Sequence, residues 1–223
     1  MPNTVRSYRS AAEIGRTELG PRPLPELAEQ HASPPLAVAD TVLDSGLRVL
    51  AVRKAAVPMV ELRLLIPFAG NESRHCARAE LLAETMLAGT GKRDRIAMDT
   101  DLAVIGGDLS TRVDPEYLIV SGSSLADGLP RLLEVLADAL TDAAYRADVV
   151  DAERDRLVER ITVARSQPAV IAREALQRHR YGDHPYAREI PHVEDVAALE
   201  GAEIVALHHN SVLARGSTLL LVG

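Results

Sequence analysis

This sequence has few aromatic residues, little lysine and a single cysteine. Tryptophan is absent and aromatic residues make up 3% of the 223 residues, so the core must be built mainly from alanine, valine and leucine. Only Lys54 and Lys92 represent lysine, a bias that we attribute to a GC-rich bacterial genome. Cys76 is the one cysteine, which excludes an intrachain disulfide and fits a reducing compartment such as the cytoplasm. We interpret its thiol as a small buried or half-buried group and not as a nucleophile, because no convincing histidine and asparagine partners accompany it.

Long hydrophobic runs are also missing. The longest apolar stretch, near Leu64 to Ala69, is far too short to span a bilayer, and the first residues lack the apolar segment of a signal peptide. We therefore expect a cytoplasmic protein with no membrane partner. The net charge of −7, from 25 basic and 32 acidic residues, argues against a nucleic-acid-binding protein, which normally presents a basic surface.

The order of the predicted elements indicates an α+β fold, in which a mostly antiparallel sheet packs against a layer of helices. Proline recurs through residues 1–37 without a sustained apolar period, so we interpret this segment as an N-terminal extension with a short helix near 11–19. Residues 38–223 form the predicted domain. Its strands are expected at 42–44, 47–52, 59–68, 108–113, 117–121 and 217–223, and its helices at 77–88, 96–105, 128–141, 147–165, 169–180, 193–199 and 202–209.

One predicted helix carries a family signature. Residues 79–90 read AELLAETMLAGT and resemble the active-site helix of the pitrilysin/insulinase family of zinc peptidases, whose inverted motif His-x-x-Glu-His leads into Gly-Thr. Four further stretches are similar to the family's opening hairpin, its Gly-Gly step into a strand, its Tyr-Gly-x-His-Pro loop and its closing strand: 43–50, 105–109, 181–186 and 217–223. The resemblance covers nearly all of the predicted domain and implies the first-domain half of a fold like that of mitochondrial processing peptidase.

The resemblance also implies that the zinc site is lost. Alignment on the Gly-Thr pair places Glu80 and Glu84 at the two histidine positions and Ala83 at the catalytic glutamate. Alignment of the helix that supplies the third ligand places Arg160 there. Neutral imidazoles bind zinc and a nearby carboxylate takes the proton from the metal-bound water, so all the groups that this chemistry requires are replaced. We therefore expect no catalytic residue and no metal ligand in this chain.

The degenerate helix face has a predicted partner. Spacings of three and four residues recur on one side of a helix, so Glu80 and Glu84 share a face, and without the resemblance a solvated acidic stripe would be the better interpretation. With it, the face points into the former zinc cleft, and we predict a partly buried salt bridge from Arg160 to Glu80 or Glu84. An alternative is a residual site for calcium or magnesium that adds oxygens from Glu153, which the positive charge of Arg160 would oppose.

The edge of the sheet is the predicted peptide-binding element. Members of the resembled family pair extended substrate with a strand at this place, which implies substrate-binding positions at Leu109, Ser110, Thr111 and Arg112. The family's Asn-Ala pair has become Ser110-Thr111, a change that leaves backbone hydrogen bonds possible.

The seven histidines give no pair at the spacing of metal ligands on a helix. We interpret all of them as ordinary surface or loop residues. His184, in Asp-His-Pro, is expected to order its own turn.

In the resembled family, four homologous domains enclose a chamber, and several members are heterodimers in which one subunit has lost the zinc motif. This implies a noncatalytic subunit or half-subunit of an assembly that processes peptides or precursor peptides. The partner would be an active, zinc-carrying homologue, or the chain would form a homo-oligomer. One alternative is a scaffold of the same fold with no role in proteolysis, and another is a metallopeptidase with atypical carboxylate ligands. The sequence stops where the family's first domain ends, which fits a natural half, a truncation or part of a longer protein.

Overall fold

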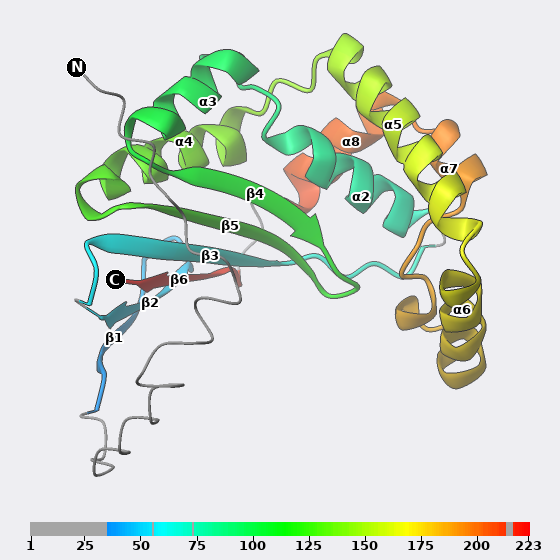
Figure 1. Ribbon diagram of the computed structural model, residues 1–223, viewed down its shortest axis with the longest axis horizontal. Coiled ribbons are helices and arrows are strands. Elements are labelled where there is room, and N and C mark those ends of the chain that lie inside the picture. The colour runs from blue at the N-terminus through cyan, green and yellow to red at the C-terminus, as the bar shows by residue number, and fades with distance from the viewer. Residues whose placement is uncertain (1–34, 55, 73, 213–215) are drawn as a thin grey trace, which may run out of the picture. The chain divides into compact units, whose positions relative to one another are not determined.

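A six-stranded sheet with the strand order β1-β2-β6-β3-β5-β4 organises the part of the chain that the structure describes (Figure 1). The computed structural model describes residues 35–54, 56–72, 74–212 and 216–223. Neighbouring strands are antiparallel except for β2 and β6, which are parallel. The strands are β1 (Ala37–Val42), β2 (Arg48–Arg53), β3 (Met59–Pro67), β4 (Asp108–Val113), β5 (Tyr117–Leu125) and β6 (Thr218–Val222).

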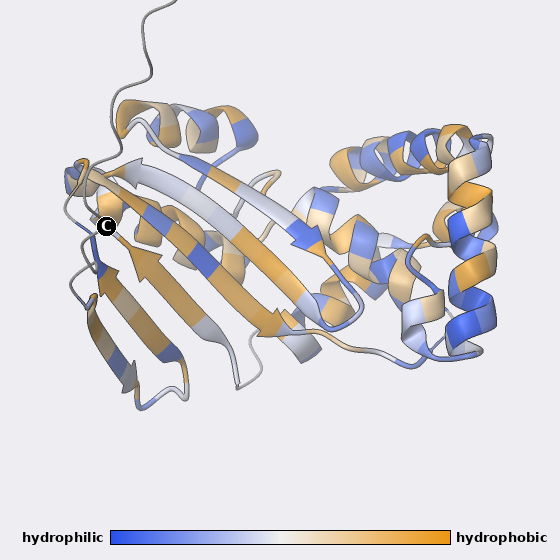
Figure 2. Ribbon diagram, turned by 60° about the horizontal axis from the view of Figure 1, so that its bottom comes forward, coloured by the Kyte–Doolittle hydropathy of each residue, from blue (hydrophilic) through white to orange (hydrophobic). Residues whose placement is uncertain are grey.

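Helices lie on one side of this sheet (Figure 1). Along β3, Leu62, Leu64 and Ile66 are buried in the core on the helical side, whereas Glu61 and Arg63 are exposed on the other face. Figure 2 shows this other face, with no helix of the described residues in front of it. The longer helices are α2 (His75–Met86), α3 (Arg95–Val104), α4 (Leu129–Asp142), α5 (Ala147–Arg165) and α6 (Pro168–Tyr181), followed by the shorter α7 (Val193–Ala197) and α8 (Gly201–Leu207).

The last strand, β6, occupies the middle of the sheet. It pairs in parallel with β2, from Arg48↔Thr218 to Val52↔Val222, and antiparallel with β3. The β1–β2 hairpin therefore reaches the rest of the sheet through β6, because the other neighbour of β2 is β1.

The turn between α2 and α3 is held against α4 by a cluster of ion pairs. The side chain of Arg93 is only 11% exposed, and it contacts three carboxylates: Asp101 at 2.8 Å, Glu134 at 2.9 Å and Asp138. Lys92 also pairs with the buried Asp138, at 2.7 Å. The cluster fixes the loop that follows the degenerate helix α2.

The predicted α+β class is confirmed, but two strand boundaries are wrong. The first strand of the hairpin spans Ala37–Val42 and not 42–44, and β5 continues to Leu125 beyond its predicted end at Ser121. All six residues of β1 are exposed, so no buried apolar alternation marks this strand in the sequence. The predicted extension over residues 1–37, with its short helix, lies outside the described residues apart from its last three positions.

A membrane-spanning helix has to combine sufficient length with an apolar sequence. Within the described ranges, no helix meets both requirements.

Candidate functional site

Helix α2 presents the degenerate positions beside the edge of the sheet. Its apolar residues, among them Leu81, Leu82 and Met86, are buried in the core, and the methyl group of Ala83 is buried as well. Glu80 is half-buried, and Glu84, one turn further along, is exposed. The helix thus turns its two carboxylates away from the core, as the spacing of four residues predicts.

Arg160 on α5 forms the predicted salt bridge, and its partner is Glu84. The Nη2 atom donates to Oε1 of Glu84 at 2.6 Å. The side chains are 56% exposed for Arg160 and 35% exposed for Glu84, so the bridge lies nearer the surface than the predicted, partly buried pair. The contact confirms the predicted bridge, and the assignment of Arg160 to the position of the third zinc ligand stays a prediction.

Glu80 is the carboxylate that this bridge leaves out. Among the described residues no hydrogen bond reaches its side chain, and it is half-buried next to the pair. Burial raises the pKa of Glu80 to about 7, the nearby charge of Arg160 acts to lower it, and Glu84 raises it further. A carboxyl group with this pKa is only partly ionised at neutral pH.

A zinc ion does not fit these residues. One of the two carboxylates on α2 is already neutralised by a guanidinium, whose positive charge opposes a metal ion, and neither carboxylate supplies the nitrogen or sulfur that zinc prefers. The buried Glu153, which the residual-cation alternative requires, pairs instead with Arg156 at 2.6 Å and Arg95 at 3.6 Å. In the described part of the chain, no three histidine, cysteine, aspartate or glutamate residues are grouped so that they could hold a metal ion.

Strand β4 lies at an edge of the sheet, as predicted, and carries the four expected peptide-binding positions. Ser110 and Arg112 are exposed on the face opposite the helices, whereas Leu109 and Thr111 are half-buried on the helical side. The hydroxyl of Thr111 donates a hydrogen bond of 2.5 Å to the carbonyl oxygen of Ala83, one of the last four carbonyls of α2. This bond, which the sequence did not reveal, ties the edge strand to the degenerate helix. Peptide binding at these positions stays a prediction.

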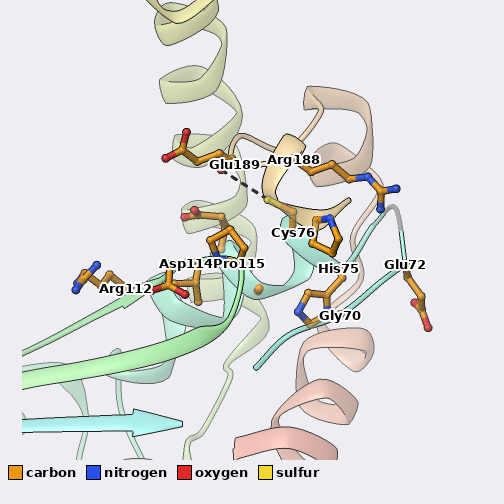
Figure 3. A pocket seen from close by; sticks show the side chains of 13 residues that line it. Gly70, Glu72, His75, Cys76, Arg112, Asp114, Pro115, Arg188 and Glu189 are labelled. Atoms are coloured by element: carbon orange, nitrogen blue, oxygen red, sulfur yellow. Dashed lines mark hydrogen bonds between the residues drawn. The ribbon is translucent and has the colours of Figure 1, made fainter. Parts of the chain in front are cut away.

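A cavity of about 190 Å³ opens between α2, the end of β4 and the segment at 185–189 (Figure 3). We call it the α2–β4 pocket; its wall includes Cys76, Glu80, Val113, Pro115 and Pro185. Cys76 is half-buried, as expected of its thiol, and burial raises the pKa of this thiol to about 12. The thiol therefore stays protonated at neutral pH. The turns Asp114-Pro115 and His184-Pro185 are visible in the sequence, but no signal there shows that they meet.

The interpretation of every histidine as a surface or loop residue is wrong for His208. This residue is buried, with one ring nitrogen 2.7 Å from the hydroxyl of Tyr145 and the other 2.9 Å from the carbonyl oxygen of Leu140. Burial lowers the pKa of His208, so it serves as a neutral, hydrogen-bonded core residue. His184 orders its turn as predicted, because its Nδ1 accepts the backbone N–H of Tyr186 at 3.3 Å.

The fold and the altered helix define this molecule as a zinc-peptidase-like domain. The chain belongs to the insulinase family (peptidase family M16), whose family model matches residues 78–192, just over half of the chain. An uncharacterized zinc protease of Mycobacterium tuberculosis is 22% identical over 188 residues, which cover 83% of this chain and 43% of that protein. The chain thus spans less than half the length of this curated relative.

Two further similar proteins are not described as zinc proteases: one is an inactive peptidase domain and the other a subunit of a cytochrome complex. The solved inactive domain of a peptidase M16 from Pseudomonas fluorescens superimposes with a TM-score of 0.78 at 22% identity, over 84% of this chain and 47% of that one. Cytochrome b-c1 complex subunit 1 of Caenorhabditis elegans is 23% identical over 112 residues, which cover 50% of this chain and 24% of that protein.

Proposed function

We propose that this chain is a noncatalytic subunit or half-subunit of a zinc metallopeptidase, and that it binds peptides together with an active homologous partner. The observation that carries the proposal is the Arg160–Glu84 salt bridge, because it joins by opposite charges two side chains that the family resemblance aligns with zinc ligands. The single, half-buried Cys76 suits a cytoplasmic assembly, where thiols stay reduced.

The peptide-binding part of the proposal rests on β4. A strand at the edge of a sheet offers unpaired backbone groups to an extended peptide, and this mode of binding needs no particular side chain on the strand. Thr111 anchors β4 to α2, so the edge is held in place next to the α2–β4 pocket. The anchored edge strand supports peptide binding by a chain that does not itself hydrolyse peptides.

The test is co-expression of this chain with the homologue of its own genome that keeps an intact His-x-x-Glu-His motif. We expect the two proteins to copurify and the complex to cleave peptides faster than the homologue alone. The chain by itself should neither cleave peptides nor carry stoichiometric zinc by elemental analysis. One tightly held zinc per chain, or a monomer that does not bind the homologue, would contradict the proposal.

A second candidate is a scaffold with this fold and no role in proteolysis. It is favoured by the similarity to a cytochrome b-c1 complex subunit over half of this chain. The co-expression experiment separates the candidates, because a scaffold would leave the peptidase activity of the homologue unchanged and would instead copurify with proteins unrelated to peptidases.

A further inference from the structure

The α2–β4 pocket lies where a bound peptide would pass. An extended peptide added to the free edge of β4 directs alternate side chains to the two faces of the sheet. Those on the helical face would point toward α2, as Val113 does at the end of β4, where it lines the pocket. The pocket is therefore placed to receive one side chain of such a peptide.

The charges around the pocket favour a cation inside it. Two arginines contribute to its wall, but Figure 3 shows the side chains of Arg112 and Arg188 extending away from the centre of the pocket. Arg188 is held by the carbonyl oxygens of Asn71 at 3.1 Å and Asp183 at 3.0 Å. The guanidinium of Arg188 is thus already bonded outside the pocket, and that of Arg112 points away from it.

Most of the carboxylates in the wall of the pocket already have an ion-pair or hydrogen-bond partner. Glu72 pairs with Arg78, and Glu189 accepts a hydrogen bond of 2.8 Å from Gln177. The Asp114 carboxylate accepts backbone N–H groups within its own turn. Glu80 is different, because among the described residues it has no hydrogen-bond partner, and its raised pKa has burial as the main cause. The pocket therefore contains one carboxylate that lacks a bonded donor.

The remaining wall is apolar and suits a chain of methylene groups. Ala79, Val113, Pro115 and Pro185 contribute hydrocarbon surface, and the neutral thiol of Cys76 behaves similarly. Lysine and arginine combine such a hydrocarbon stem with a charged end, and they bury the stem readily. We propose that the α2–β4 pocket binds a lysine or arginine side chain of a peptide paired with β4, with Glu80 as the carboxylate that receives its charge.

This inference rests on the proposed function, since it names the class of peptide that the same site selects. The test uses the full chain and four fluorescein-labelled, nine-residue peptides built from threonine and valine. They differ only in the central residue, which is lysine, arginine, norleucine or glutamate. Fluorescence anisotropy should show at least roughly tenfold tighter binding of the lysine and arginine peptides than of the other two, as a charge-assisted hydrogen bond allows.

Two variants assign the preference to Glu80. Glu80→Gln should reduce the preference for lysine over norleucine to less than about twofold, because a neutral amide loses the ionic attraction but keeps the size of the side chain. Glu159 is an exposed glutamate next to Arg160, and Glu159→Gln should keep the full preference for lysine over norleucine. Circular dichroism of both variants checks that they fold.

The outcomes separate the two proposals. Equal binding of all four peptides, or a lysine preference that survives Glu80→Gln, would overturn the pocket assignment while leaving peptide binding intact. If none of the four peptides binds at concentrations up to about 1 mM, the peptide-binding function itself fails, and the pocket assignment fails with it.

Discussion

Replacing Glu80 with glutamine should stabilise the domain at neutral and alkaline pH but not at acid pH. The pKa of this carboxyl group rises from 4.5 to about 7 on folding, mainly through burial. The folded state therefore holds the proton more tightly than the unfolded state, and ionisation of Glu80 costs stability as the pH rises from about 4.5 to 7. The difference of about 2.5 pKa units, at roughly 1.4 kcal/mol each, sets a cost of the order of 3 kcal/mol above pH 7.

Urea unfolding of the wild type and of Glu80→Gln, between about pH 4.5 and 8, measures this cost. The two proteins should have similar free energies of unfolding at the acid end, and the variant should gain stability as the pH increases. Other titrating groups are common to both proteins, so their contributions largely cancel in the difference between the two free energies of unfolding. Glu84 and Arg160 are the exceptions, because they face Glu80 and respond to its charge. Glu159→Gln serves as the exposed control and should follow the wild type. Parallel curves for wild type and Glu80→Gln would refute the reasoning.

Three further substitutions test the contacts around the site. Arg93→Met should destabilise the domain by about 3 to 5 kcal/mol in urea unfolding, because it leaves the buried Asp138 without its closest partner; a loss below about 1 kcal/mol would show that Lys92 compensates. Arg160→Ala should cost less than about 1 kcal/mol, since its bridge is largely exposed, and a double-mutant cycle with Glu84→Gln isolates that energy. Thr111→Val should cost about 1 kcal/mol in thermal unfolding by removing the hydrogen bond to α2, and an unchanged Tm would mean that this bond contributes nothing.

Much of the site was predictable because helices repeat regularly. The family motif fixes the register of α2, and the helical period then places Glu80 and Glu84 on one face. The same argument on α5 selects Arg160 over its neighbour Glu159 as the residue that faces α2, and Arg160 does bridge to Glu84 at 2.6 Å. The sequence did not show which of the two glutamates would pair with Arg160, because that depends on the crossing geometry of α2 and α5.

Contacts between distant segments account for what the sequence missed. The burial of His208 follows from its bonds to Tyr145 and Leu140, which lie 63 and 68 residues away along the chain. Three separate segments of the chain form the α2–β4 pocket, so no local sequence motif predicts it. The first strand was predicted at the wrong residues for a different reason, since an exposed edge strand such as β1 needs no apolar alternation.

The central position of β6 has a consequence for the order of folding. The β1–β2 hairpin is synthesised before the other described strands, but its place in the sheet exists only once β6, which follows all of them in the sequence, lies between β2 and β3. Closing this contact spans nearly the whole domain, and such long-range pairings form slowly. Until then, the edge of β2 that β6 will cover is unpaired and can form non-native contacts while the chain is still on the ribosome. The hairpin should therefore be the last part of the sheet to dock, after β6 has been synthesised.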